Sequence, residues 1–257
     1  MANTYLFGAS GHGKVVKDIL HANGVKVEAF VDDNSELNEC AGRPVLHDVK
    51  GRSPMIVSIG NCRIHKLVVE RLIALNKDIE FTTAIHPSAV VSPSAKIGEG
   101  TVVMAGAVIN ADAVIGKHCI VNTGATIDHE CVIGDYCHIA PGVNISGDTH
   151  IGEGTWVGVG SCVIQCLSIG KNCFIGAGSV VVKDLPDGVV YFVRASVVQV
   201  LSFQIEPASV LLAHAFGIIQ WRRTTCIVFQ QSLVFRLKFL AFDNRNVCLL
   251  QVVNALV

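Results

Sequence analysis

The chain has 257 residues, 51% of them hydrophobic, and its 20 basic side chains nearly balance 21 acidic ones for a formal net charge of -1. The length allows one or two domains with a large core, and the balanced charge gives no electrostatic reason to expect a nucleic acid as partner. The opening residues, MANTYLFGASGHGK, lack the basic start and apolar run of a secretory signal, so we expect a cytoplasmic protein whose ten cysteines are free thiols or metal ligands rather than disulfides.

The N-terminal segment, residues 1–83, predicts a small Rossmann-like α/β domain. The stretch TYLFGASGHGKVVKDIL indicates an apolar strand, a glycine loop and an amphipathic helix, an order that brings a phosphate to a helix N-terminus. KVEAFVDDN supplies a second strand that ends in two aspartates, where acidic side chains can meet a base or a ribose hydroxyl. MIVSIGN supplies a third strand, and a helix is expected from about Cys62 to Asn76. The segment has room for one mononucleotide half, which argues against a nicotinamide cofactor; a glycine turn without any ligand is the alternative.

A six-residue repeat dominates residues 84–187. Every sixth position from Ile85 to Val181 is Ile or Val. An α-helix would spread this period around its surface, whereas a solenoid with flat faces puts each of these residues at an equivalent inward point. The repeat therefore predicts a parallel β-helix whose stacked coils contact only their neighbours.

Two further positions of the repeat have a recognisable composition. The fourth residue after each aliphatic one is nearly always small, as a tight interior corner requires. The residue directly after the aliphatic one is often Gly, and there we expect a turn that needs a permissive backbone. Cys131 and Cys137 occupy the small position, so we expect buried thiols that act as small hydrophobic side chains. Their spacing to the neighbouring histidines also differs from the usual zinc patterns.

His129 falls outside both of these positions and is flanked by Asp128 and Glu130. A carboxylate can hold an imidazole in one tautomer and raise its basicity, as a general base near neutral pH requires. His138, nine residues further on, could face the same groove. A solvated histidine without a catalytic role is the alternative for each.

The stretch NTGATIDHECVIGDYCHIAPGVNISGDTHIGEGTWVGVGSCV closely resembles the hexapeptide-repeat, left-handed β-helix sugar acetyltransferases, typified by the bacillosamine-pathway N-acetyltransferases and the sialic-acid O-acetyltransferases. The resemblance runs over about residues 2–187. It implies a left-handed coil, a homotrimer with active sites between neighbouring β-helices, acetyl-CoA as co-substrate and no metal. It also implies N-acetylation of a nucleotide-linked 4-amino sugar for surface glycan synthesis. The alternatives are a sugar O-acetyltransferase and a non-catalytic β-helix scaffold.

The resemblance assigns roles to individual residues. His129 becomes the catalytic base and Glu130 the group that polarises it, while the backbone amide of Gly147 faces the thioester carbonyl. The implied acetyl-CoA contacts are Asn122, His138, Gly147, Val159, Ala177 and Gly178. The implied contacts to the sugar nucleotide are Gly8, Ser10, Gly11, His12, Gly13, Asp32, Asp33, Gly60 and Asn61. Related β-helix carbonic anhydrases bind zinc through three histidines, and the matching alternative here is a zinc site formed by His129, His138 and His150.

Residues 188–257 depart from the family's pattern. The family normally ends soon after a Gly-x-Pro-Ala type segment, whereas this chain continues as VVYFVRASVVQVLSFQ. Polar or charged residues interrupt the apolar tail before it reaches about twenty apolar residues, so we expect no transmembrane helix, with membrane contact by the tail as the alternative. We interpret the tail as an atypical extension, lineage-specific or non-native, such as a shifted reading frame.

Overall fold

The computed structural model describes residues 3–192, 219–222, 225–228, 237–238 and 251–252. The chain divides into two compact units, Met1–Ala195 and Ser196–Val257. In the second unit β24 (Ile219–Arg222) pairs with β25 (Thr225–Val228), and β26 (Leu237–Lys238) pairs with β27 (Gln251–Val252), both antiparallel. Most of the predicted extension lies outside the described residues, and none of the described helices has the length and apolar character to cross a bilayer.

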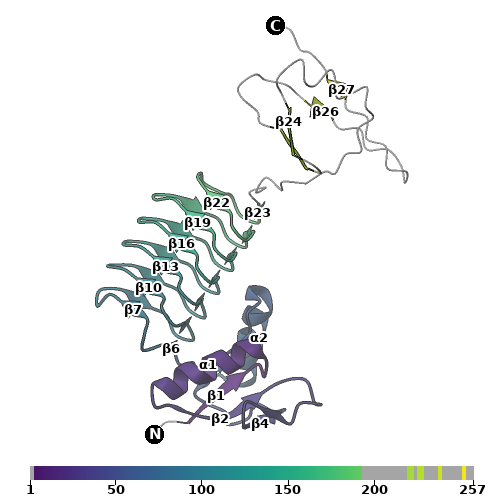
Figure 1. The fold of residues 1–257 in the computed structure, drawn as a ribbon. Coiled ribbons are helices and arrows are strands. Elements are labelled where there is room, and N and C mark those ends of the chain that lie inside the picture. Colours follow the sequence, from purple (N-terminus) through teal and green to yellow (C-terminus); the bar gives the residue numbers. More distant parts are fainter. Residues whose placement is uncertain (1–2, 193–218, 223–224, 229–236, 239–250, 253–257) are drawn as a thin grey trace. The chain divides into compact units, whose positions relative to one another are not determined.

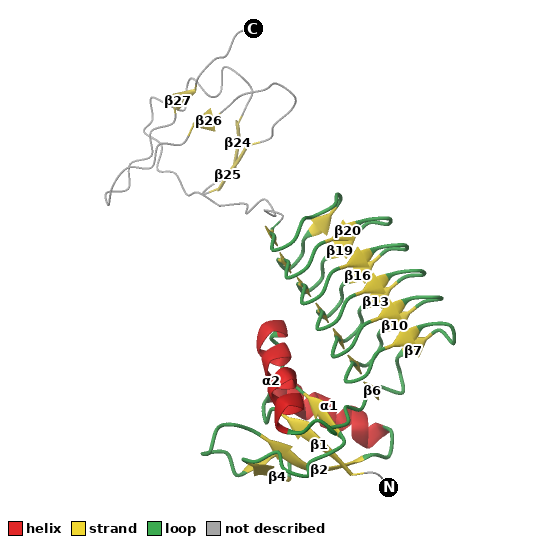
Figure 2. Cartoon of the chain, turned by 180° about the vertical axis from the view of Figure 1, so that it is seen from behind, coloured by secondary structure: helices red, strands yellow, loops and turns green. Residues whose placement is uncertain are grey.

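A five-stranded sheet in the order β3-β4-β2-β1-β5 forms the N-terminal part of the first unit. Its strands are β1 (Asn3–Phe7), β2 (Lys26–Val31), β3 (Glu39–Cys40), β4 (Arg43–Leu46) and β5 (Met55–Val57). All neighbours pair in parallel except β3 and β4. Helices α1 (Gly11–Ala22) and α2 (Cys62–Leu75) pack on opposite faces (Figure 2), because the adjacent residues Leu6 and Phe7 point into separate cores beneath them. The predicted strand, glycine loop and helix are confirmed, and α2 matches the expected helix to within one residue.

The repeat region folds into three stacked parallel sheets, which confirms the predicted solenoid (Figure 1). Residues eighteen apart pair with each other, as Val108 does with Thr126, so three hexads make one coil. The strands are β6 (Ala84–Ile85), β7 (Val90–Val91), β8 (Lys96–Ile97), β9 (Val102–Val103), β10 (Val108–Ile109), β11 (Val114–Ile115), β12 (Ile120–Val121), β13 (Thr126–Ile127), β14 (Val132–Ile133), β15 (His138–Ile139), β16 (Asn144–Ile145), β17 (His150–Ile151), β18 (Trp156–Val157), β19 (Cys162–Val163), β20 (Ser168–Ile169), β21 (Phe174–Ile175), β22 (Val180–Val181) and β23 (Val190–Tyr191). The last of these lies one strand beyond the expected boundary at residue 187 and pairs with β21.

The interior of the solenoid follows the repeat. The aliphatic position is buried along the coils, and so are Cys131 and Cys137 in the small position, both free thiols as predicted. The small position has a second property that size alone does not indicate. Most of its hydroxyl and thiol members donate to a backbone carbonyl fifteen residues further on, as Thr101 does to Gly116 O at 2.8 Å and Cys131 to Ser146 O at 3.2 Å, whereas Cys173 donates to Pro186 O. These bonds satisfy carbonyl groups that would otherwise be buried without a donor at the corner.

The expected reason for the glycine after each aliphatic residue is wrong. The φ of Gly134 lies outside the left-handed region, but a Cβ there would lie 2.6 Å from the backbone nitrogen of Glu153 in the next coil. This glycine is therefore required by close approach of two backbones. The left-handed turn position comes two residues later, and Glu130 with φ 60° and Tyr136 with φ 58° both occupy it.

The α/β domain and the solenoid are joined by apolar and polar contacts within the first unit. Val102, Met104 and Ile120 of the solenoid belong to the same core as the residues beneath α1. Lys66 of α2 forms an ion pair with Glu153 at 2.6 Å. The loop between β5 and α2 thereby lies against the solenoid and can contact residues of β15.

Candidate active site

His129 lies in the turn that follows β13. Hydrogen bonds to Asp128, one of them from Asn110 in the previous coil, fix the backbone of this turn. Asp128 Oδ1 accepts from the backbone amide of His129 and from Asn110 Nδ2, both at 2.8 Å. The hydrogen bond from Asn110, followed by that from the His129 amide, lowers the pKa of Asp128, so this carboxylate stays charged. Asp128 therefore orients the turn and does not contact the imidazole ring.

Glu130 is the carboxylate that reaches the ring. Its Oε2 lies 3.2 Å from His129 Nδ1, and the two side chains are 64% and 58% exposed. In the neutral tautomer, Nδ1–H donates to Glu130 and Nε2 keeps its lone pair. The geometry therefore presents Nε2 of His129 as an open proton acceptor.

Gly147 lies one coil further on, directly beside the His129 ring. A Cβ at this position would lie 2.6 Å from both Cε1 and Nε2 of the ring, so only glycine leaves the imidazole room. Its carbonyl accepts from Cys166 N at 3.0 Å, whereas its amide donates to no acceptor in the part of the chain that the structure describes. A free backbone N–H next to a base can stabilise an oxyanion that forms there.

The neighbouring thiols are not nucleophiles. Burial raises the pKa of Cys131, and its Sγ donates to the Ser146 carbonyl. The hydrogen bond with Cys119, together with burial, raises the pKa of Cys137. Both cysteines stay protonated at neutral pH and serve the core.

A second group of predicted residues lies at another corner of the coil, after strands of the sheet that contains β12, β15, β18 and β21. Asn122 follows β12, Val159 follows β18, and Ala177 and Gly178 follow β21. Gly178 N donates to Val159 O at 2.8 Å, so these positions stack in successive coils. Val159 is 53% exposed, and a Cβ on Gly178 would meet nothing within 4 Å. The corner thus offers an open track with small side chains.

His138 on β15 is buried and has a hydrogen-bond partner on each nitrogen. Its Nδ1–H donates to Gly60 O at 2.8 Å, its Nε2 accepts from Asn122 Nδ2 at 3.1 Å, and its ring lies 4.3 Å from that of Trp156. Burial lowers the pKa of His138, which favours the neutral form. Because His129 lies at the corner between the sheets of β13 and β14, while β15 belongs to the third sheet, the expectation that both histidines face one groove does not hold within a single chain.

The glycine loop of the α/β domain contains two glycines at which a Cβ would clash with the protein and one at which it would not. A Cβ on Gly13 would collide with the Gly8 carbonyl, and a Cβ on Gly8, whose φ is 112°, would lie 2.9 Å from Ser58 O. A Cβ on Gly11, by contrast, would meet nothing within 4 Å. Asp32 Oδ2 accepts from the Ala9 amide at 2.8 Å and so ties this loop to the end of β2.

Of the other predicted nucleotide contacts, Asp33 and Asn61 are bonded to protein groups, whereas the Ser10 side chain makes no cap bond. Asp33 forms an ion pair with Arg71 at 2.9 Å, and Asn61 Oδ1 caps α2 through the Ile64 amide at 3.1 Å. Ser10 is the N-cap of α1 but makes no side-chain cap bond, so its hydroxyl is available. Burial, with a smaller contribution from His138, lowers the pKa of His12 to about 4.

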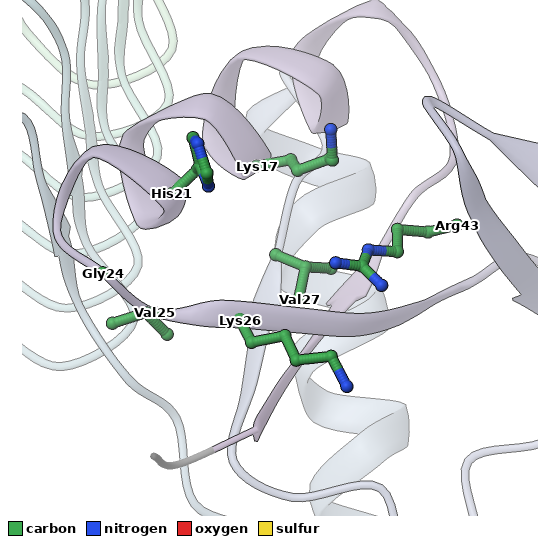
Figure 3. A pocket seen from close by; sticks show the side chains of 7 residues that line it. All are labelled: Lys17, His21, Gly24, Val25, Lys26, Val27 and Arg43. Atoms are coloured by element: carbon green, nitrogen blue, oxygen red, sulfur yellow. The ribbon is translucent and has the colours of Figure 1, made fainter.

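One hollow of the α/β domain is lined by none of these residues (Figure 3). Its volume is about 220 Å³, and it is lined by Lys17, His21, Gly24, Val25, Lys26, Val27 and Arg43. The ammonium groups of Lys17 and Lys26 point away from each other in Figure 3, and Lys26 is already paired with Glu28 at 2.8 Å. The cations do not converge on one point, so this hollow offers no anion site. Likewise, no cluster of three or more His, Cys, Asp or Glu suited to a metal ion occurs among the described residues.

Several site residues were not found by the sequence reasoning. Asn110 could have been found, because it stands eighteen residues before Asp128 and the coil length brings such residues together. Trp156 stands eighteen residues after His138 in the same way. The pair of Lys66 and Glu153 could not be found from the eighteen-residue spacing, because it joins a helix outside the repeat to the solenoid across 87 residues.

Two family models match the chain. Residues 3–72 match the PglD N-terminal domain, and residues 112–147 and 148–183 match the bacterial transferase hexapeptide repeat. Among curated proteins, UDP-N-acetylbacillosamine N-acetyltransferase of Bacillus subtilis (strain 168) is 42% identical over 115 residues, which are 41% of this chain. The match covers about half of that relative's length, 52%.

Solved structures cover more of the chain. A variant of perosamine N-acetyltransferase from Caulobacter crescentus, in complex with CoA and GDP-perosamine, is 39% identical with a TM-score of 0.71 and covers 75% of this chain and 94% of its own. The acetyltransferase domain of PglB from Neisseria gonorrhoeae FA1090 is 40% identical with a TM-score of 0.70 and covers 75% of this chain and 97% of its own. The chain therefore belongs to the hexapeptide-repeat, left-handed β-helix sugar acetyltransferase family and carries a PglD-type N-terminal domain.

Proposed function

We propose that the protein transfers the acetyl group of acetyl-CoA to the amine of a nucleotide-linked 4-amino sugar. The observation that carries this proposal is the grouping of an exposed imidazole, a carboxylate 3.2 Å from its Nδ1, and Gly147, at which an added Cβ would lie 2.6 Å from Nε2 and whose amide donates to no acceptor among the described residues. Aminolysis of a thioester requires a proton acceptor for the attacking amine and a donor for the tetrahedral oxyanion. His129 and Gly147 supply these two groups.

The reaction then proceeds through one tetrahedral intermediate. The sugar amine attacks the thioester carbonyl carbon, and His129 Nε2 takes the proton that the nitrogen loses. The Gly147 amide donates to the oxyanion, and Glu130 stabilises the imidazolium that forms. Collapse of the intermediate breaks the C–S bond, and His129 returns its proton to the departing CoA thiolate, which restores the neutral base.

The amino-sugar part of the proposal rests on the N-terminal domain and on the relatives. The perosamine N-acetyltransferase structure contains CoA together with GDP-perosamine, and the Bacillus relative is named for UDP-N-acetylbacillosamine. We assign the sugar nucleotide to the loops at the ends of β1, β2 and β5. Ser10 makes no side-chain cap bond and a Cβ on Gly11 would meet nothing within 4 Å, so both are open to a ligand there, and Asp32 shapes the loop.

We propose a homotrimer, and the support for it is that the expected site residues lie at two separate corners of one chain. In one chain, His129 and Gly147 lie at one corner, whereas Asn122, Val159 and Ala177 lie at another. A ring of three identical chains would set the first corner of one β-helix against the second corner of its neighbour. Acetyl-CoA would then lie between two chains, along Val159, Ala177 and Gly178. A cytoplasmic location stays a prediction from the N-terminal sequence.

A thiol-release assay tests the proposed reaction. Purified protein is mixed with acetyl-CoA and, separately, with UDP-, GDP- and dTDP-linked 4-amino sugars and with free sialic acid. We expect thiol release with at least one nucleotide-linked amino sugar. Release with sialic acid alone would instead establish an O-acetyltransferase, and no release with any acceptor would favour the scaffold alternative.

A further inference from the structure

His65 lies at the junction between α2 and the solenoid and is 2% exposed. Its ring meets His118 edge-on at 5.8 Å and Tyr136 at 6.3 Å. Phe81 completes the group, 4.7 Å from His118. We call these four side chains the junction box.

His65 also forms a hydrogen bond through its Nδ1 atom. Its Nδ1–H donates to Ile59 O at 3.0 Å, back into the loop between β5 and α2. The next carbonyl of this loop, Gly60 O, accepts from His138 Nδ1 at 2.8 Å. Asn61, the following residue, caps α2. Two histidines from opposite sides therefore hold two consecutive carbonyl groups of one short loop.

The other nitrogen of His65 shows that packing alone does not explain this residue. Its Nε2 is buried without a hydrogen-bond partner among the described residues. An unpaired buried acceptor costs free energy that a phenylalanine of similar shape would not cost. The feature that distinguishes His65 from phenylalanine here is therefore its Nδ1–H, which donates a hydrogen bond to Ile59 O.

We propose that His65 is a positioning residue, which fixes the loop Ile59–Asn61 for the sugar nucleotide and, through Gly60 O, holds His138 in its Nδ1–H tautomer against Asn122. The inference rests on the proposed function in one respect: Gly60 and Asn61 are taken as nucleotide contacts. The link from His65 to His138 stands on the hydrogen bonds alone.

Three variants of the full-length protein test this role. His65→Phe keeps a ring in the junction box but removes the donor, and His65→Asn places an amide nitrogen where Nδ1 lies. His118→Phe is the matched control, because in the described part of the chain this ring makes ring contacts and no hydrogen bond to the loop. Should His65→Phe fail to fold, His65→Gln, whose amide lies one bond further out, replaces it.

Two readouts are taken: the separate KM values for sugar nucleotide and acetyl-CoA, and the imidazole 15N spectrum of His138. We expect His65→Phe to raise the KM for the sugar nucleotide about 3- to 10-fold, the size of one net hydrogen bond, with a smaller rise in the KM for acetyl-CoA, because His138 and Asn122 are expected contacts of that ligand. We also expect a second tautomer of His138. His65→Asn should restore both readouts, and His118→Phe should change neither.

The inference is overturned if His65→Phe leaves both readouts at the wild-type values, or if His118→Phe changes them equally. If the wild-type protein turns over no nucleotide-linked amino sugar, the proposed function fails. The His138 spectrum then decides the positioning role by itself, because it requires no turnover.

Discussion

Two histidines nine residues apart occupy opposite environments. His129 is more than half exposed, and among the residues that the structure describes its ring bonds only Glu130, through Nδ1. His138 is 6% exposed, and both of its nitrogens are occupied, by Gly60 and Asn122. An imidazole that exchanges protons with a substrate must have an open nitrogen, whereas one that fixes neighbouring groups must not. The geometry therefore suits His129 to the proposed role of a base and His138 to that of a connector between neighbouring groups.

Replacing His129 should have the largest effect. We expect His129→Ala to lower kcat by about 10²- to 10⁴-fold, the range for a lost general base, with acetyl-CoA binding close to normal. Cys131→Ala is the matched control two residues away, because this buried thiol serves only the core. Steady-state kinetics and calorimetric titration with CoA check both. Loss of turnover in the cysteine variant but not in the histidine variant would mean that the thiol is the reacting group.

Gly147→Ala should be the next most damaging change. The added Cβ would meet Cε1 and Nε2 of His129 at 2.6 Å, so the ring must move. Moving the imidazole by roughly 1 Å is expected to lower kcat by about 100-fold. The φ of Gly147 lies outside the left-handed region, so the backbone accepts alanine and the unfolding temperature should hardly change. Wild-type kcat in this variant would show that Gly147 does not define the position of the base.

Gly11→Ala should have a smaller and selective effect. Because a Cβ there meets no protein atom within 4 Å, the substitution leaves the fold intact and fills space only where a ligand would lie. We expect a several-fold rise in the KM for the sugar nucleotide and no change for acetyl-CoA. Gly13→Ala, which would collide with the Gly8 carbonyl, serves as the contrast and should reduce protein stability instead. An equal rise in both KM values for Gly11→Ala would contradict separate ligand sites.

Three histidines that the fold shields from water, His12, His65 and His118, should make the fold sensitive to acid. Burial is the main cause that lowers the pKa of His12 to about 4, of His65 to about 3 and of His118 to about 4, where Glu99 and Asp135 oppose the shift. The unfolded chain takes up these protons near pH 6.5. Stability is therefore complete above pH 6.5 and is lost as the pH falls toward 4, by up to about 1.4 kcal/mol per pH unit for each histidine.

Denaturant unfolding between pH 7 and pH 4 measures this slope. His118→Phe removes one of the three groups and should make the slope shallower while leaving the junction box filled. An identical slope in the wild-type protein and this variant would mean that His118 is already protonated in the folded state.

Much of the fold could be predicted because a β-helix repeats its local rule. The six-residue period predicted the aliphatic column, which is partly buried from Ile85 to Ile97 and buried from Val103 to Val181, and the small position predicted Cys131 and Cys137 as core residues. The role of the glycines was misjudged, because contact between coils depends on the eighteen-residue spacing that only the completed coil reveals. Gly134 is the example: its sequence context suggests a turn, but its neighbour is the backbone of Glu153.

The site was less predictable than the fold. The closeness of Glu130 to His129 could be read from adjacent positions, and Gly147 lies eighteen residues further on. The burial of His138 depends on Gly60 from another domain, 78 residues away, which no periodicity indicates. Asp128 was a candidate partner for the imidazole, but its carboxylate is used by Asn110 and the backbone.

Mixed assemblies of two variants distinguish an active site that joins the His129 corner of one chain to the Val159 corner of its neighbour, as we propose, from a site within one chain. His129→Ala removes the base, while Val159→Trp fills the exposed acetyl-CoA track of an otherwise intact chain. Each variant alone should be nearly inactive. Coexpressed in equal amounts, the two should regain about a quarter of the wild-type kcat per site, because about one interface in four then joins two intact corners. Activity that stays at the level of the two parent variants would contradict a site shared between chains.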